Sequence, residues 1–101
     1  MATSKTASGR TKPGSTAWQQ YTANGLYVDV DTSAGKFTGA PVYITSLGGN
    51  NGNWKVIGAD SIYQPTATGF RVYIKWEDNS ALTPATANSY QWHINWIGME
   101  T

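Results

Sequence analysis

A chain of 101 residues is long enough for one domain with a single core, so we expect neither a second catalytic domain nor a regulatory one. The formal net charge is +1, but three of the seven basic residues lie in the first twelve positions, so residues 13–101 carry four basic and six acidic groups and lack the basic face of a nucleic-acid binder. The sequence contains no cysteine, which excludes a disulfide framework and a thiolate metal site.

The first segment of the chain, residues 1–16, is almost free of apolar side chains and rich in Ser, Thr, Gly and Lys. Such a segment buries too little apolar surface to order itself, so we predict a flexible N-terminal arm over 1–16 and a single β-sandwich domain over 17–101. The arm lacks the apolar stretch of a secretory signal, and no run of about 18 apolar residues follows it. Neither a visible signal peptide nor membrane insertion is therefore expected.

Segments typical of β-strands fill the rest of the chain. Strict alternation of apolar and polar residues marks most of them. Order is expected to begin near Trp18, in the first segment. Gly58 interrupts the longest segment, where a bulge or a close backbone approach is expected. The six segments are 17–22, 25–31, 41–47, 53–63, 69–76 and 90–96. No stretch has apolar residues at helical spacing, and the connections are rich in turn-forming residues. We predict an all-β fold, a compact six-stranded antiparallel β-sandwich without helices.

His93 is the single histidine of the chain, and it lies in the last of these segments. Alternation places Trp92 and Trp96 on the core face and His93 on the opposite face, beside Gln91 and Asn95. The sequence has no nucleophile-elbow pattern and no visible convergence of acid, base and electrophile, so we predict that the protein is not an enzyme. A small hydrolase that uses His93 is the weaker alternative.

Residues 29–35 begin like a calcium-binding loop, with the pattern Asp-x-Asp-x-Ser. The sixth and twelfth positions of that loop are Ala34 and Ala40 instead of Gly and Glu, which excludes an EF-hand. Another kind of calcium site remains an alternative. The simpler interpretation is that Asp29 and Asp31 lie on the exposed face of a strand and that Asp31 starts a turn. No metal ion or other cofactor is therefore predicted.

The stretch of the sequence best suited to ligand binding is 75–80, where Trp76 runs directly into two carboxylates and an amide, Glu77, Asp78 and Asn79. Sugars are recognised by such a mixture, because their hydroxyl groups bind carboxylates and amides while their apolar face lies against an aromatic ring. The predicted loop that follows is long, which indicates function or mobility. A solvated acidic turn explains the same residues equally well. Of the five tryptophans, we expect one or two to face a ligand.

Several features, taken in order along the chain, resemble the H-type lectins, the group of the snail agglutinin and the discoidin C-terminal domain. The features that carry the resemblance are Pro41 before a hydrophobic strand, Asn53 to Val56, Thr68 to Phe70, Trp76 at a strand end, and Tyr90 six residues before Trp96 and Ile97. The resemblance is close over 37–101 and loose over 17–36. It implies a small β-sandwich that assembles as a homotrimer and binds galactose or N-acetylgalactosamine.

In that family the sugar site lies between protomers. The resemblance implies that Lys55 takes the place of the family's basic residue and Trp76 that of its aromatic residue, while either Asp29 or Asp31 takes that of its N-terminal aspartate. Two residues depart from the family pattern: a lysine stands at 55 in place of arginine, and Glu77 stands where the family has histidine. Sugars related to galactose therefore remain candidates for the ligand.

We predict a non-catalytic, carbohydrate-binding lectin that acts outside the cell or at its surface. The predicted sugar-binding residues are Lys55, Trp76, Glu77 and Asp78, with Asp31 and Asn79 as outer candidates. Its predicted partners are a glycan and further copies of itself in a trimer, in which several weak sites gain avidity. The alternative is a structural or adhesive trimerisation domain of a larger extracellular or phage-associated fibre, without a sugar pocket.

Overall fold

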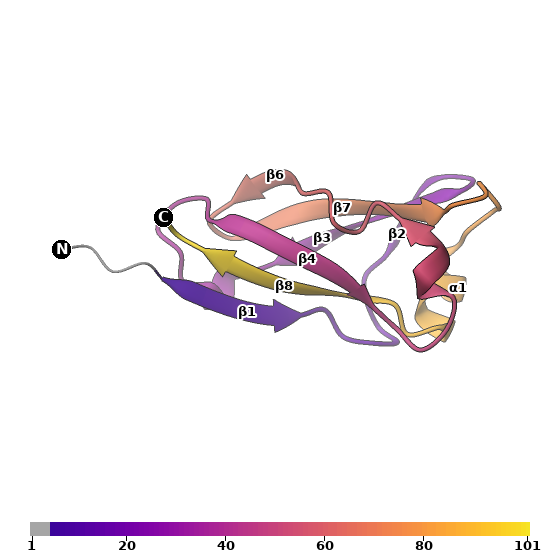
Figure 1. Ribbon diagram of the computed structural model, residues 1–101, viewed down its shortest axis with the longest axis horizontal. Helices are drawn as coiled ribbons and strands as arrows, with labels where there is room; N and C mark the ends of the chain where they lie inside the picture. The colour runs from indigo at the N-terminus through magenta and orange to yellow at the C-terminus, as the bar shows by residue number, and fades with distance from the viewer. Residues whose placement is uncertain (1–4) are drawn as a thin grey trace.

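Two antiparallel sheets form a sandwich-like fold in the computed structural model, which describes residues 5–101 (Figure 1). One sheet has three strands, in the order β1 (Thr6–Arg10), β8 (His93–Met99) and β4 (Val42–Gly48). The other has five, β2 (Gln19–Thr22), β3 (Gly25–Asp31), β7 (Gly69–Trp76) and β5 (Val56–Ile57), with β6 (Tyr63–Thr66) also paired to β7. The predicted antiparallel β architecture is confirmed in part: the fold is mostly β and not all β, and the described residues form eight strands in place of six.

The core lies between the sheets, and period-two alternation decides which side chains fill it. In β3 and β7 the inward residues are neighbours across the strands: Leu26 lies opposite Ile74, and Val28 lies opposite Val72. All four are fully buried. Trp92, just before β8, is also fully buried, as alternation predicted. Burial of these side chains supplies most of the driving force for folding, at about 1.5–3 kcal/mol for each large one.

Strand β4 turns a tyrosine and a threonine inward and leaves two aliphatic residues exposed. The hydroxyl of Tyr43 donates to the carbonyl oxygen of Thr66 at 2.7 Å, and Thr45 Oγ1 donates to the carbonyl oxygen of Ala59 at 2.7 Å. Both side chains are buried, and these hydrogen bonds remove the penalty for burying a hydroxyl. Val42 and Ile44 therefore point to the outside of the three-stranded sheet, where they are exposed.

The prediction of a flexible arm is wrong for the N-terminal strand. Thr6 to Arg10 pair with β8 from Met99 to Asn95, and Thr16 is buried with its N–H donating to Asn88 Oδ1 at 3.1 Å. Composition misled here because backbone groups pair in a sheet without needing apolar side chains of their own. Residues 1–4, which the predicted arm also included, lie outside the described residues.

The predicted long loop after β7 contains a short helix, α1 (Pro84–Ser89), so the expectation of no helix is wrong. Thr83 is its N-cap and accepts from the Thr86 N–H at 3.3 Å, and Pro84 occupies its first turn. Six residues are too few to show a helical period, so the Thr-Pro pair was the one available signal. Two single-turn 3-10 helices, η1 (Ser33–Gly35) and η2 (Asn53–Lys55), complete the fold. Among residues 5–101, no helix is long and apolar enough to cross a membrane.

Candidate functional site

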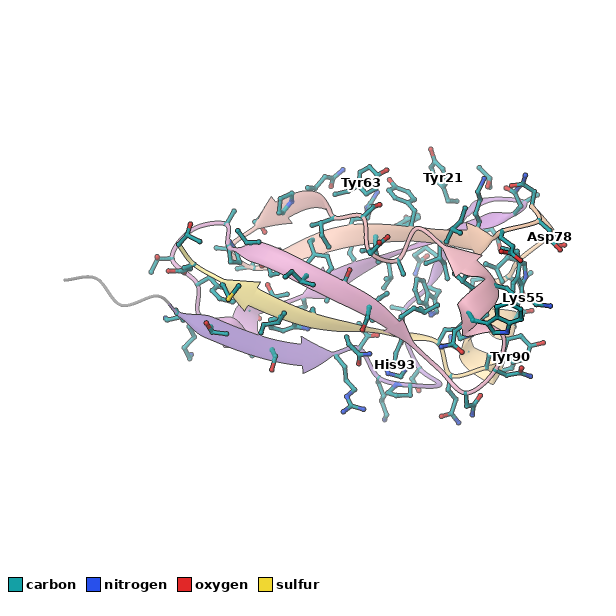
Figure 2. The ribbon with its side chains drawn as sticks, in the orientation of Figure 1. Tyr21, Lys55, Tyr63, Asp78, Tyr90 and His93 are labelled. Carbon is teal, nitrogen blue, oxygen red and sulfur yellow. The ribbon has the colours of Figure 1, made fainter. Side chains whose placement is uncertain are left out.

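An open depression of about 440 Å³ lies at the end of the sandwich where β7 ends. We call it the Trp54–Trp76 depression. It is lined by Asn51, Gly52, Trp54, Lys55, Trp76, Asp78, Ser80 and Tyr90. Lys55, Asp78 and Tyr90 lie together at this end of the molecule, opposite the C-terminus (Figure 2). The depression therefore combines aromatic rings with one cation and one anion.

A cluster of aromatic rings connects the depression to the core. The Trp76 ring is half-buried, and its centroid lies 4.9 Å from that of Trp92 at an interplanar angle of 75°. The Tyr90 ring lies 5.6 Å from that of Trp92 and 6.4 Å from that of Trp76. Trp92 Nε1 in turn donates to the carbonyl oxygen of Asn51 at 2.8 Å, which ties the 48–53 loop to the cluster. The rings of Trp76 and Tyr90 are thus held by buried contacts, so ligand binding need not order them.

Trp54 is the most exposed aromatic residue of the depression. It lies in η2, with 81% of its surface accessible, and the Nζ of Lys55 is 5.2 Å from its ring centroid. The sequence predicted that one or two tryptophans would face a ligand but did not identify Trp54. The available signal was its position directly after the Gly- and Asn-rich run 48–53, at the start of the predicted strand 53–63. An exposed indole beside a lysine offers a flat apolar face with a hydrogen-bond donor at its edge.

Pairing of β5 with β7 brings Lys55 next to the turn that follows Trp76. Val56 lies opposite Trp76, and the N–H of Glu77 donates to the carbonyl oxygen of Lys55 at 2.9 Å. Asp78 follows in the same turn and lines the depression. The structure therefore gathers three of the six predicted site residues, because it brings Lys55 beside Trp76 and Asp78, about twenty positions further along the sequence.

Asp78 is held as a carboxylate by the turn in which it lies. Its Oδ1 accepts from the backbone N–H of Ser80 at 2.9 Å. Hydrogen bonds from the side chain and backbone of Ser80 lower the pKa of Asp78 below its ordinary value of 3.8, and the charge of Lys55 lowers this pKa further. Asp78 therefore offers a hydrogen-bond acceptor to a ligand at neutral pH.

Ser80→Ala is expected to raise the pKa of Asp78 towards its ordinary value, because the alanine lacks the hydroxyl that stabilises the carboxylate. Since folding lowers this pKa, the carboxylate stabilises the folded state above pH 3.8, and that stabilisation is lost as the pH falls through the folded-state pKa. Carboxyl-carbon NMR titration of both proteins measures the change. Asp29, whose pKa is lowered chiefly by Arg71, is the internal control and should not move. An unchanged pKa of Asp78 would contradict the assignment.

The other three predicted site residues lie outside the depression. Glu77 and Asn79 are exposed in the same turn but do not line it, and Asn79 Oδ1 accepts from Lys75 Nζ at 2.9 Å. Asp31 pairs with Gly69 at the opposite end of β7 from Trp76. Gly69 and Trp76 are seven positions apart in β7, which is about 23 Å at a rise of 3.3 Å per residue. Within one chain, Asp31 is therefore too far away to share a small ligand with Lys55.

The aspartates of the calcium-like motif are engaged by protein groups. Asp29 accepts two hydrogen bonds from Arg71, at 2.7 and 2.9 Å, and the Asp31 carboxylate accepts from the N–H of Ser33 at 2.8 Å. The Arg71 hydrogen bond is the main reason that the pKa of Asp29 is lowered. In the described part of the chain, no three His, Cys, Asp or Glu side chains are grouped as metal ligands. Asp31 instead begins a turn, as the simpler interpretation predicted.

His93 is half-buried at the first position of β8, away from the Trp54–Trp76 depression. Its Nδ1 lies 2.8 Å from the carbonyl oxygen of Gln91, so Nδ1 carries the hydrogen and donates. Gly48 is its cross-strand neighbour, and a Cβ there would lie 2.3 Å from His93 Nε2. His93 therefore packs tightly against Gly48, the last residue of β4.

In comparisons with known proteins, no family model matches this chain, and no curated protein matches it either. The resemblance to the H-type lectins therefore stays a prediction from the sequence.

Proposed function

We propose that the protein is a non-catalytic, H-type-lectin-like carbohydrate-binding protein that binds a sugar in the Trp54–Trp76 depression. The observation that carries the proposal is the meeting of Lys55, Trp76 and Asp78 around one open hollow, with the exposed ring of Trp54 at its side. The first three are residues that the sequence predicted on chemical grounds or by resemblance. An aromatic face with a nearby donor and acceptor is what a sugar ring requires.

Each group in the depression has a part in this binding. The apolar face of a pyranose ring stacks on the indole of Trp54 or Trp76. The Lys55 ammonium donates to a ring or hydroxyl oxygen, and the Asp78 carboxylate accepts from a hydroxyl. A lysine donates as a point charge without the planar fork of arginine, so galactose, N-acetylgalactosamine and sugars of related shape are the proposed ligands.

The proposed assembly is a homotrimer, and the outer face of the three-stranded sheet supports it. Val42 and Ile44 of β4 are 51% and 57% exposed, and they pair with Met99 and Ile97 of β8, which are also exposed. These four side chains carry no charge, so two copies of this face meet without like-charge repulsion. We call them the aliphatic patch. This patch equally favours the second candidate function, a trimerisation domain of a larger fibre without a sugar pocket.

Ile44→Asp is expected to convert the trimer to a monomer, because assembly would bury a carboxylate in an apolar contact. Light scattering coupled to size-exclusion chromatography gives the mass directly. Ile57→Asp is the matched control, since Ile57 is an isoleucine of similar exposure, 47%, on the other sheet. A monomeric wild-type protein, or a trimer that persists in Ile44→Asp, would contradict assembly through the aliphatic patch.

A calorimetric titration of the wild-type protein tests the binding function. The panel contains galactose, N-acetylgalactosamine, mannose and rhamnose, and a glycan array extends it to oligosaccharides. We expect saturable binding of a galactose-type sugar with one site per chain. Absence of binding to every sugar by a trimeric protein would reject the lectin and favour the fibre domain, which shares the trimer but not the ligand.

A further inference from the structure

A second depression, of about 470 Å³, lies on the outer face of the five-stranded sheet. We call it the tyrosine depression. Its polar and aromatic lining consists of Tyr21, Thr22, Asn24, Tyr63, Tyr73 and Lys75. Ile57 and Gly58 close one side. Tyr21 and Tyr63 project from the same side of the molecule, where no other sheet covers them (Figure 2).

Three tyrosine rings form the wall of this depression and support one another. The ring centroid of Tyr73 lies 5.0 Å from that of Tyr21 and 4.9 Å from that of Tyr63, with interplanar angles of 64° and 85°. Tyr21 is nevertheless 63% exposed and Tyr63 49% exposed. The rings are therefore fixed by edge-to-face contacts while much of their area stays open to solvent. A ligand that stacks on them loses little affinity to ordering of side chains.

At Gly58 the backbone lies directly against Tyr73, which closes one side of the tyrosine depression. Gly58 has a φ of 101°, and a Cβ at this position would lie 2.4 Å from the carbonyl oxygen of Tyr73. Only glycine permits this approach, which brings the chain after β5 directly against β7. Gly58, which interrupts the longest predicted strand, is thus explained by the close approach of its backbone to Tyr73, one of the two alternatives that the sequence offered.

The tyrosine depression is the immediate neighbour of the Trp54–Trp76 depression. In the β5–β7 ladder, Val56 pairs with Trp76 and Ile57 pairs with Lys75. Trp76 lines the first depression, whereas Ile57 and Lys75 line the second. Successive residues of a strand point to opposite faces of the sheet, so Trp76 lies on the inner face and Lys75 on the outer face. Because β5 is the edge strand of this sheet, a glycan chain that occupies both hollows must pass around this edge.

The lining of the tyrosine depression defines the chemistry of its ligand. Among residues 5–101, no carboxylate lines it, and Lys75 is the one charged residue of its lining. Lys75 Nζ donates to Asn79 Oδ1 at 2.9 Å, and Asn24 Oδ1 accepts from Thr22 Oγ1 at 2.8 Å, which leaves the amide N–H groups of Asn24 as donors. A positively charged ligand is disfavoured by Lys75. A neutral ligand with hydroxyl groups and an apolar face is favoured, and these are the properties of a further sugar unit.

We propose that the tyrosine depression is an extension subsite, which binds the second and later sugar units of an oligosaccharide whose first unit occupies the Trp54–Trp76 depression. This inference rests on the proposed function, and it adds that the natural ligand is a glycan chain and not a single sugar. The stacked units contact Tyr21 and Tyr63, because these rings have the largest exposed faces. Each stacking contact strengthens oligosaccharide binding only.

The test compares a monosaccharide with an oligosaccharide that ends in the same sugar. Tyr21→Ala and Tyr63→Ala are each expected to weaken oligosaccharide binding about tenfold, the effect of losing one aromatic contact, and to leave monosaccharide binding unchanged. Tyr21→Phe and Tyr63→Phe keep the ring and are the matched controls, which should retain most of the affinity. Calorimetry measures both ligands, and thermal melting shows that each variant is folded.

The remaining outcomes distinguish a failure of the subsite alone from a failure of the proposed function. If the wild-type protein binds both ligands with equal affinity, or if the alanine variants weaken both equally, the subsite is rejected while sugar binding stands. If the alanine variants change the mass in solution instead of the affinity, the tyrosines belong to an interface and the subsite is rejected. If the wild-type protein binds neither ligand, the proposed function and the subsite fail together.

Discussion

Replacing Trp92 with alanine is expected to lower the free energy of unfolding by about 3–5 kcal/mol, the usual effect of removing a large aromatic side chain from a packed core. Trp92 is fully buried and contacts the rings of Trp76 and Tyr90, so its removal leaves a cavity that rigid neighbours cannot fill. For a domain of about 100 residues, each kcal/mol shifts the melting temperature by about 4–8 °C. The melting temperature is therefore expected to fall by well over ~10 °C.

Trp92→Phe separates the packing of this side chain from its hydrogen bond. Phenylalanine keeps most of the buried ring but lacks the N–H that donates to Asn51, so the carbonyl of Asn51 loses its partner. The hydrogen bond from Trp18 Nε1 ends on the backbone carbonyl of residue 92 and survives both substitutions. Urea denaturation of the three proteins gives the two contributions. A loss of less than about 1 kcal/mol in Trp92→Ala would contradict a rigid core at this position.

Trp54→Ala is expected to reduce sugar affinity about tenfold or more while leaving the melting temperature unchanged. The indole is 81% exposed and lies beside the ammonium of Lys55, so its removal is expected to disturb little packing. Its apolar face, however, is the largest open surface that the Trp54–Trp76 depression offers a sugar. Calorimetry with the sugar identified for the wild-type protein, together with thermal melting, measures both effects.

A comparison with Trp76→Ala shows why Trp54→Ala is the cleaner test of sugar binding. Trp76 packs against Trp92 and Tyr90, so its replacement is expected to lower stability as well as affinity, and a loss of binding there has two explanations. Trp54→Phe keeps a flat ring and should recover part of the affinity that Trp54→Ala loses. If Trp54→Ala binds sugar as tightly as the wild-type protein, the sugar does not stack on this ring.

The sandwich was predictable where one face of a strand is apolar, as in β3, β7 and β8, because period-two alternation then specifies the buried face. It was not predictable for β1, whose Ser, Gly and Thr residues are held by backbone pairing to β8 and not by burial of their side chains. In β4, alternation separated the side chains into two faces but did not show which face is buried. Tyr43 and Thr45 point inward because their hydroxyls donate to the backbone carbonyl oxygens of Thr66 and Ala59.

The candidate site was predictable only in part, because it depends on contacts between distant segments. Trp76 and Asp78 are neighbours in the sequence, and their chemistry alone indicated a binding role. Lys55 entered through the family resemblance, and the β5–β7 pairing that places it beside Trp76 has no local signature. Trp54 lies in a single turn between a polar loop and a two-residue strand, where no periodic pattern exists to indicate which way a side chain points.

The pairing of β1 with β8 also determines how the molecule can be attached to a surface. Thr6 lies opposite Met99, so both ends of the described chain leave the sandwich at the end far from α1 and the Trp54–Trp76 depression (Figure 1). A biotin tag or a flexible tether on either end would therefore hold the molecule with the depression facing away from its support. Immobilisation through either end should consequently leave glycans free access to the sites, and a circularly permuted chain could join the two ends with a short linker.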